Sequence, residues 1–450
     1  MKHLKNPVTR RTFLKGTLAS FTTVSIVPGY VLGLNGAKSP NEKMNLAFIG
    51  VGGRGAANLQ ALGGENVVAL CDVDWQRATA SFEKHPGAKQ YRDYRKMLDQ
   101  LEKQLDGVVV STPDHTHAVA AMAVMKRGKN LYCEKPLAHS VGEIRTLMKA
   151  AREHKVMTQL GNQGHSFPTI HTFRSWIEAG AIGKVHTIHA GCGSNGYTRI
   201  DSLPLLAEKH PVPETLDWDW WLGPAQYRPY HPLYLPGKWR AWMPFGSGAI
   251  GDWFCHVVDP VFWALDLGSP TTIQASTKDY DPVKHADTFP KGTIITYEFP
   301  AKGRRGPVKL LWFDGTEKIP QPADLEADEK VPGTGAVVMG DQGTIIYGSH
   351  GAANLRIVPE AKMEAYRNAP KPAWETKAHH EDWLNAIRTG KPAGSNFDYG
   401  GALSELAMLG IIAMRMPDTK LEWDGAKMAF RNNAQANAML MPKYREGWSL

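Results

Sequence analysis

Acidic side chains are missing from the first 37 positions of this 450-residue sequence, which hold five lysine and arginine residues instead. Taking those five from the 52 basic residues of the whole chain leaves 47, against 44 acidic residues. A charge balance so close to neutral is too weak to favour a polyanion as partner. We therefore predict that the chain binds no nucleic acid.

Cysteine is also scarce. The chain has four cysteines, Cys71, Cys133, Cys192 and Cys255, and no two of them form the C-x-x-C pair of a zinc or redox motif. We accordingly predict no metal site. Low-complexity tracts and repeats of solenoid period are absent as well. With 42% hydrophobic and 21% charged residues, the composition is that of a globular protein, and the length favours two domains.

The acid-free N-terminus has the pattern of an export signal. Residues 9–15 read TRRTFLK, in which Arg10 and Arg11 match the pair of a twin-arginine signal, and an apolar stretch from Leu18 to Leu34 follows. That stretch approaches the length of a membrane span, but a proline, two glycines and several hydroxyl residues make it a poor one. We predict a signal peptide over residues 1–37 that is cleaved, export of the folded protein to the periplasm, and no stable membrane insertion afterwards.

Glycines then cluster directly after a short apolar strand predicted over residues 45–49. The cluster reads Gly50-Val51-Gly52-Gly53-Arg54-Gly55, a helical stretch follows it, and Asp72 ends the next apolar run. Strand, glycine turn, helix, strand and acid in this order are typical of a dinucleotide-binding unit.

Each part of this unit has a mechanical role. Gly50 makes the tight turn, Gly52 lets the backbone approach the pyrophosphate, and Gly55 lets helix and strand pack closely. The N-terminus of the helix faces the phosphates with unpaired N–H groups. Asp72 would accept hydrogen bonds from the adenosine ribose and repel a 2′-phosphate, so the predicted cofactor is NAD rather than NADP.

Strand–helix alternation continues to about residue 160, with apolar strands at 106–113 and 130–133. Such alternation predicts a parallel, doubly wound Rossmann sheet. Ligands gather at the carboxyl ends of strands in sheets of this kind. Besides the three glycines and Asp72, the residues predicted to bind the cofactor are Gly53, Arg54, Thr112, Pro113, His117, Glu134 and Lys135.

At this point the sequence resembles the glucose–fructose oxidoreductase, inositol dehydrogenase and rhizopine-catabolism family of sugar oxidoreductases, in a branch with a twin-arginine signal. The resemblance covers residues 44–415 and rests on four motifs: the glycine loop, TPDHTH at 112–117, EKPLA at 134–138 and GAIGDWFCH at 248–256. It implies a Rossmann domain and an open mixed-sheet domain that often serves oligomerisation. It also implies a catalytic lysine, Lys135, with an aspartate and a histidine, Asp252 and His256.

The pattern of the second half agrees with such a domain. Strands with turn residues and no obvious helix run from Thr271 to Ile357, which predicts a large, open and mostly antiparallel sheet in a C-terminal α/β domain. A partner subunit would cover one face of this sheet, so we expect a homo-oligomer, a dimer or a tetramer. The predicted boundaries are 38–160 for the NAD-binding domain, 161–430 for the substrate-binding domain and 431–450 for a tail.

Oxidation of a secondary alcohol needs a base for the hydroxyl proton. A lysine taken out of water, such as Lys135 at a strand end, can relay protons, and the imidazole of His256 titrates close to neutral pH. Asp252 lies four residues before His256, on the same face of a helix, and Pro260 predicts that His256 lies near a helix start. The sequence leaves open which of Lys135 and His256 takes the proton. Predicted substrate contacts, besides Asp252 and His256, are Asn162, Gln163, His165, Trp239 and Arg240.

Three functions are compatible with these residues. The first is an NAD-dependent dehydrogenase that transfers a hydride from a secondary hydroxyl of a sugar or glycoside. The second is a redox-neutral glycosidase or epimerase that works through a transient keto-sugar and keeps NAD tightly bound. The third is a non-catalytic sugar-binding protein, which the presence of Lys135, Asp252 and His256 disfavours.

Overall fold

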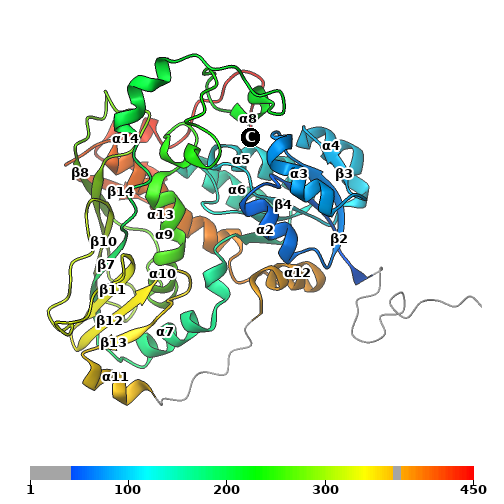
Figure 1. Cartoon of the computed structure of the whole chain (residues 1–450). Helices are drawn as coiled ribbons and strands as arrows, with labels where there is room; N and C mark the ends of the chain where they lie inside the picture. Colours follow the sequence, from blue (N-terminus) through cyan, green and yellow to red (C-terminus); the bar gives the residue numbers. More distant parts are fainter. Residues whose placement is uncertain (1–41, 368–376) are drawn as a thin grey trace, which may run out of the picture. The chain divides into compact units, whose positions relative to one another are not determined.

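The computed structural model describes residues 42–367 and 377–450, so the predicted export signal lies outside the described residues. The elements below all belong to the unit Met44–Leu450. Two sheets organise this unit, and Figure 1 shows the first among the blue and cyan helices and the second at the opposite side.

The first sheet has six parallel strands in the order β3-β2-β1-β4-β5-β6. The strands are β1 (Asn45–Ile49), β2 (Asn66–Cys71), β3 (Lys89–Tyr91), β4 (Gly107–Val110), β5 (Asn130–Cys133) and β6 (Thr158–Leu160). The connecting helices are α2 (Arg54–Ala61), α3 (Trp75–Lys84), α4 (Tyr94–Leu101), α5 (Asp114–Met125) and α6 (Val141–Glu153). Aliphatic strands buried on both sides and helical crossovers produce this arrangement, so the predicted Rossmann sheet is confirmed.

A helix from far along the chain completes the packing of this sheet. α12 (His379–Thr389) contributes Trp383 and Leu384 to the same core cluster as Leu46 and Phe48 of β1. A Cβ on Gly107 would lie 2.9 Å from the Trp383 ring, so the absence of a side chain at that position makes room for the indole.

The second sheet has nine strands in the order β13-β12-β11-β7-β10-β9-β8-β14-β15. They are β7 (Val185–Cys192), β8 (Thr272–Lys278), β9 (Gly292–Phe299), β10 (Val308–Gly315), β11 (Thr334–Gly340), β12 (Gly343–Gly348), β13 (Arg356–Val358), β14 (Leu421–Asp424) and β15 (Ala429–Phe430). Only β7 and β10 pair in parallel among these described strands, and all other pairs are antiparallel. The predicted open, mostly antiparallel sheet is therefore confirmed.

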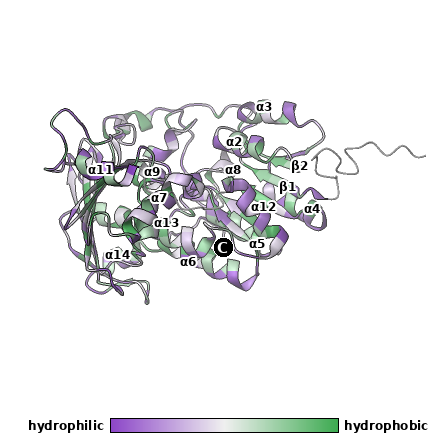
Figure 2. Ribbon diagram, turned by 90° about the horizontal axis from the view of Figure 1, so that it is seen from below, coloured by the Kyte–Doolittle hydropathy of each residue, from purple (hydrophilic) through white to green (hydrophobic). Residues whose placement is uncertain are grey.

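Helices cover one face of the second sheet, chiefly α9 (Gly248–Val257) and α13 (Phe397–Met414), with α7 (Pro168–Glu178) and α10 (Asp259–Ala264) beside them. Figure 2 shows α9 and α13 beside the strands, with α6 of the first domain next to α13. α13 is the one described helix long and apolar enough to cross a membrane by composition, but 78% of it is buried inside the protein. Its apolar length serves as core between the two sheets.

The chain between β7 and α9 forms an aromatic-rich insert. It contains the short helices η6 (Ile200–Ala207), α8 (Trp218–Leu222) and η7 (Lys238–Ala241). Most of its aromatic side chains pack on one another in a separate small core, which includes Trp218, Trp221 and Tyr234. The remaining described helices are η4 (Glu102–Gln104), η5 (Gln163–Ser166), α11 (Glu360–Arg367) and α14 (Ala434–Ala438).

Candidate active site

A cavity of about 360 Å³ lies along the carboxyl edge of the first sheet. One side of the cavity is made by the residues that follow β1, β2, β4 and β5, and the other side by the insert, α9, the loop after β12 and the C-terminus. Of the residues predicted from sequence, those that line it are Gly50, Gly52, Arg54, Asp72, Thr112, Pro113, His117, Glu134, Lys135, Gln163, Trp239, Arg240, Asp252 and His256. Motifs from Gly50 to His256, more than two hundred positions apart, therefore meet at one site.

The glycine loop between β1 and α2 is shaped by close backbone contacts. Gly50 has φ +79°, which favours glycine. A Cβ on Gly55 would lie 1.8 Å from the carbonyl oxygen of Gly50, so a side chain there would push α2 away from the turn. The predicted roles of Gly50 in the turn and of Gly55 in close packing both have a structural basis here.

Arg77 lies over the next part of the loop. A Cβ on Gly52 would meet the Arg77 Cγ at 2.6 Å, and one on Gly53 would meet its Nη2 at 2.6 Å. The predicted approach of a pyrophosphate to Gly52 therefore requires the flexible, exposed Arg77 side chain to swing aside.

Asp72 holds the glycine loop in place. Its Oδ2 accepts hydrogen bonds from the N–H groups of Val51 at 2.8 Å and Gly52 at 3.3 Å, and its Oδ1 accepts one from Asp74 at 2.9 Å. Burial raises the pKa of this carboxyl, and the three N–H donors oppose that rise. A carboxylate can accept about four hydrogen bonds, so Asp72 retains capacity for a ribose hydroxyl.

Glu134 joins three elements beneath the cavity. Its Oε1 accepts hydrogen bonds from Arg54 Nε at 3.0 Å, Asn58 Nδ2 at 2.8 Å and Gln163 Nε2 at 3.2 Å. A Cβ on Gly161 would lie 2.6 Å from the Glu134 carboxyl carbon. Glu134 therefore positions its neighbours, and Arg54 is left with exposed guanidinium surface beside the loop.

His117 connects the segments that follow β4 and β5. Its Nδ1 lies 2.8 Å from the carbonyl oxygen of Pro136, and its Nε2 lies 2.8 Å from that of Thr112. Both ring nitrogens are thus used by the protein itself. His117 lines the cavity but holds Thr112 and Pro136 in position, and neither of its ring nitrogens is free.

Lys135 and Asp252 meet at the centre of the cavity wall. The Lys135 ammonium forms a short ion pair with Asp252 Oδ1 and donates to the Asp252 carbonyl oxygen at 2.6 Å. Arg240 Nε lies 3.3 Å from Oδ1, and the Tyr197 hydroxyl donates to Oδ2 at 2.6 Å. Burial opposes ionisation of Asp252, but Lys135 and Arg240 outweigh it and hold its pKa below the ordinary range. The carboxylate is therefore ionised and fully engaged.

His256 lies in the last turn of α9, one turn after Asp252. The prediction that it lies near a helix start is wrong, because α9 ends at Val257 and Pro260 belongs to the first turn of a new helix, α10. A proline in a first turn needs no N–H partner. The break between the helices thus removes the constraint that Pro260 would impose on a continuous helix.

Burial lowers the pKa of His256 well below its ordinary value, and the positive charge of Lys135 and the nearby His350 lower it further. The ring is therefore neutral at neutral pH. Its Nδ1 is buried without a hydrogen-bond partner among the described residues. Because the neutral ring of His256 lines the cavity, it is available there as a proton acceptor.

His350 is a site residue that the sequence reasoning missed. Its ring stacks on that of His256, with centroids 4.1 Å apart and planes 20° from parallel. Its backbone has φ +58°, and its N–H donates to the His256 carbonyl oxygen at 3.2 Å. The sequence carries one weak signal, a histidine next to Gly351 directly after an apolar strand, which many loops share.

Two predicted substrate contacts are not at the cavity. Asn162 and His165 are buried in a separate polar cluster, where Asn162 Nδ2 donates to Asp259 Oδ2 at 3.1 Å and His165 Nδ1 lies 2.9 Å from Asp259 Oδ1. Tyr399 also donates to that carboxylate. Both residues satisfy a buried acid at the α9–α10 junction, so their predicted role in contacting substrate is not supported by their positions.

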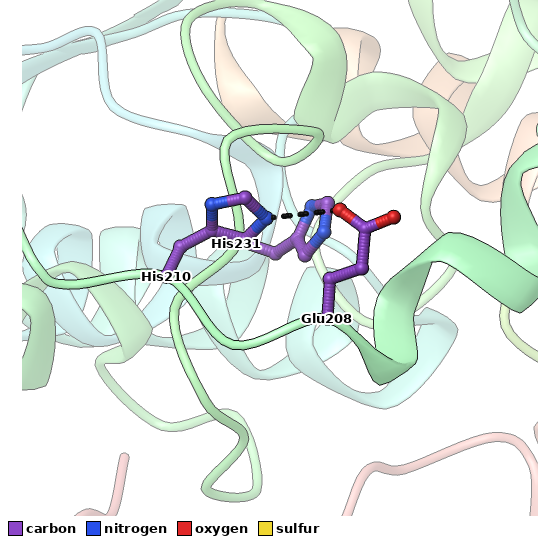
Figure 3. Close-up of side chains that lie close together, drawn as sticks. All are labelled: Glu208, His210 and His231. Carbon is purple, nitrogen blue, oxygen red and sulfur yellow. Dashed lines mark ion pairs between the residues drawn. The ribbon is translucent and has the colours of Figure 1, made fainter.

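A second group of side chains lies in the insert, away from the Lys135–Asp252 pair. Figure 3 shows Glu208, His210 and His231, whose ligand atoms lie within 4.8 Å of one another. However, Nδ1 of His231 accepts a hydrogen bond from the Leu233 N–H at 3.1 Å. A neutral ring with an acceptor Nδ1 carries its proton on Nε2, which is then a donor and not a metal ligand. We assign no metal to this group.

Comparison with protein families gives two matches. A model of the "Oxidoreductase family, NAD-binding Rossmann fold" matches residues 44–162, and the companion model of the "Oxidoreductase family, C-terminal alpha/beta domain" matches residues 195–304. Together they cover just over half of the chain. His350 and the C-terminal tail lie outside both matched ranges.

Curated relatives include inositol 2-dehydrogenase 2 of Saccharopolyspora erythraea, 31% identical over 33% of this chain and 46% of that protein. Levoglucosan dehydrogenase of Pseudarthrobacter phenanthrenivorans is 26% identical over 48% of this chain and 46% of that protein. The chain thus spans a little under half the length of these relatives.

Solved structures match over more of the chain. An NAD-binding protein from Listeria innocua has a TM-score of 0.58 at 16% identity, over 84% of this chain and 97% of that one. An inositol dehydrogenase homologue from Azotobacter vinelandii, complexed with NADH and myo-inositol, has a TM-score of 0.56 at 15% identity, over 85% of this chain and 98% of that one. At such identities these matches establish the fold.

Proposed function

The chain belongs to the glucose–fructose oxidoreductase, inositol dehydrogenase and rhizopine-catabolism family of oxidoreductases, and from this premise we propose that it transfers a hydride between NAD and a secondary hydroxyl of a sugar or glycoside. One observation carries the proposal. The glycine loop with Asp72 and the Lys135–Asp252–His256 group line the same cavity, so nucleotide and alcohol can meet there.

The residues present suit a dinucleotide. The close contact of Gly55 with Gly50 leads directly into the N-terminus of α2, whose N–H groups suit phosphate. Asp72 has acceptor capacity for a ribose hydroxyl and carries the charge that disfavours a 2′-phosphate. When bound, the nicotinamide supplies the hydride acceptor.

The proton needs a separate acceptor, and His256 suits this role because its ring is neutral and lines the cavity beside Lys135 and Asp252. Lys135 uses two of its three N–H bonds on Asp252, which leaves one for the substrate oxygen. As the C–H bond gives up a hydride, the hydroxyl proton passes to His256 and the ammonium of Lys135 stabilises the oxygen. Asp252 positions Lys135 and remains ionised throughout.

The test starts with the nucleotide that purifies with the protein. We expect NAD(H) at close to one equivalent, and reduced nicotinamide on incubation with at least one member of a panel of polyols and glycosides. Purification with NADP, or no reduction with any alcohol in a broad panel, would count against this function.

A redox-neutral reaction is the second candidate, and the position of Trp448 near the C-terminus, which lines the cavity together with Asp72, favours it. A nucleotide that stays bound must be reduced and reoxidised within one turnover, which suits epimerisation or glycoside cleavage through a transient keto-sugar. The two candidates differ in stoichiometry, since only the dehydrogenase leaves one reduced nucleotide for each product formed.

We also propose export through the twin-arginine route, which the Arg10-Arg11 pair supports. Replacing both residues by lysine should leave folded precursor in the cytoplasm, and undiminished periplasmic recovery of that variant would contradict the proposal. Assembly as a homo-oligomer is proposed on the width of the open second sheet, and sedimentation analysis of the purified protein would test it.

A further inference from the structure

The adenosine end of the cavity is walled by three segments that lie far apart in sequence. The first runs from the loop after β2 through β3 to the start of α4 and contributes Asp72, Arg92 and Tyr94. The second is α8 of the insert, which contributes Trp220 and Trp221, and the third is the C-terminus, which contributes Trp448. Figure 1 shows the C-terminus beside α8.

The insert is fixed to the β2–α3 loop by backbone hydrogen bonds. Asp217 N–H donates to the Val73 carbonyl at 2.9 Å, and Trp75 N–H donates to the Thr215 carbonyl at 3.1 Å. These bonds begin one residue after Asp72, the acid suited to the ribose. The insert therefore lies against the part of the loop that a bound adenosine would contact.

The C-terminal tail is fixed to the insert in turn. Arg445 donates from Nε to the Gly223 carbonyl and from Nη2 to the Asp219 carbonyl, each at 2.6 Å, and pairs with the Asp219 carboxylate. A guanidinium at these carbonyls satisfies the C-terminal end of α8. Three residues farther on, the chain reaches Trp448.

Arg95 of α4 joins all three segments. Its guanidinium lies 4.0 Å from the centroid of the Trp220 ring and 5.0 Å from that of Trp448, and the two rings meet edge to face at 5.6 Å. Cation–π contacts of this kind hold an aromatic pair in place over a charged residue. Trp220, Trp448 and Arg95, which we call the aromatic clamp, thus lock the insert and the tail onto α4.

We propose that the aromatic clamp covers the adenosine half of the dinucleotide and retains it between turnovers, so that Trp220 and Trp448 are cofactor-retaining residues. This inference rests on the proposed binding of NAD(H) and adds the property that release is slow. Both indoles line the cavity, so we expect release of the nucleotide at this end to require separation of the tail from α8.

The test measures the release of NADH from the full-length protein, followed by nicotinamide fluorescence during a chase with excess NAD+. Trp448→Ala and Trp220→Ala should each speed release by about 5- to 100-fold, the range expected for loss of one aromatic face against a base. Trp448→Phe keeps a ring and should restore most of the retention. Tyr227→Ala, an insert residue that is 71% exposed and does not line the cavity, is the matched control and should release NADH as the wild type does.

Failure of this inference can be told apart from failure of the proposed function. If the wild type binds NADH and both tryptophan variants release it at the wild-type rate, the clamp does not retain the nucleotide, although the proposed function stands. If Trp448→Ala and Tyr227→Ala speed release equally, the effect is general loosening of the insert and the inference is wrong. If the wild type binds no NADH, the proposed function itself fails.

Discussion

At one end of the cavity the glycine loop is shaped by close backbone contacts, whereas at the opposite end charged side chains converge on one another. At the first end, N–H groups of Val51 and Gly52 meet one carboxylate, Asp72. At the other end, Lys135 and Arg240 converge on Asp252. A backbone site is sensitive to added volume, and a charged site is sensitive to the loss of single groups and to pH. Substitutions at the two ends should therefore fail in different ways.

The largest effect is expected at the charged end. Lys135→Ala and His256→Ala should each lower kcat by about 10²–10⁴-fold, the usual contribution of a positioned acid or base, while nucleotide binding stays near normal. The double variant should be little worse than the poorer single variant, because the two groups act as one unit. Asp252→Asn, which keeps the shape of the positioning residue, should cost less than either.

Thermal unfolding of the same preparations is the control for these variants. A lower melting temperature with nearly normal activity per folded molecule would mean that His256 is structural. In that case the contrast between the two ends of the cavity would not hold.

At the backbone end, Gly55→Ala should weaken nucleotide binding and lower stability, because its Cβ would lie 1.8 Å from the Gly50 carbonyl oxygen. Overpacking of this kind costs about 1–3 kcal/mol. Gly64→Ala is the matched control, since its Cβ would meet no described atom within 4 Å. Calorimetric titration with NAD measures the difference, and equal affinities for the two variants would show that the close contact is unimportant.

A smaller change is expected in the choice of nucleotide. Asp72→Ser removes the charge that repels a 2′-phosphate and should raise the affinity for NADP relative to NAD by about tenfold, or ~1.4 kcal/mol. NAD should also bind more weakly, because the loop N–H groups lose their carboxylate acceptor. Binding of both nucleotides to both proteins checks this. A wild type that already prefers NADP would contradict the role given to Asp72.

The smallest effect concerns pH. Because the pKa of His256 is held well below its ordinary value, the ring stays neutral, and kcat/KM should not fall as pH drops through the ordinary histidine pKa of about 6.5. His350→Phe keeps the stacked ring but removes one source of positive charge, so the pKa of His256 should rise. The pH at which kcat/KM falls on the acid side should then move up by less than about one pH unit. If kcat/KM of the wild type already falls with a midpoint near pH 6.5, the buried, neutral state of His256 would be contradicted.

The glycine-loop end of the cavity could be predicted from sequence almost completely. Gly50, Gly55 and Asp72 act within a single βαβ unit, where short-range order fixes their relation. The same locality explains why the parallel sheet was predicted correctly. A helix beginning at His379 is also indicated by the spacing of Trp383, Leu384 and Ile387, but its packing on that sheet, from more than two hundred residues away, has no local signal in the sequence.

The opposite end of the cavity, which contains the Lys135–Asp252–His256 group, was predicted only in part. Lys135, Asp252 and His256 could be named from motifs, but their partners come from other segments: Tyr197 from the insert and His350 from the loop after β12. His165 shows the converse error, since its polarity suggested a ligand contact when its partner is the buried Asp259. Sequence spacing does not determine whether a side chain in a loop points toward the cavity or into the protein core.

Single-turnover reduction of bound NAD tests the central claim most directly. The wild type and Lys135→Ala, each loaded with NAD, would be mixed with the most active polyol or glycoside of the panel, and the near-ultraviolet absorbance of reduced nicotinamide would be followed. We predict reduction by the wild type and a rate about 10²–10⁴-fold lower for the variant at equal nucleotide occupancy. Reduction at the same rate by both proteins would contradict the assignment of this cavity as the site of hydride transfer.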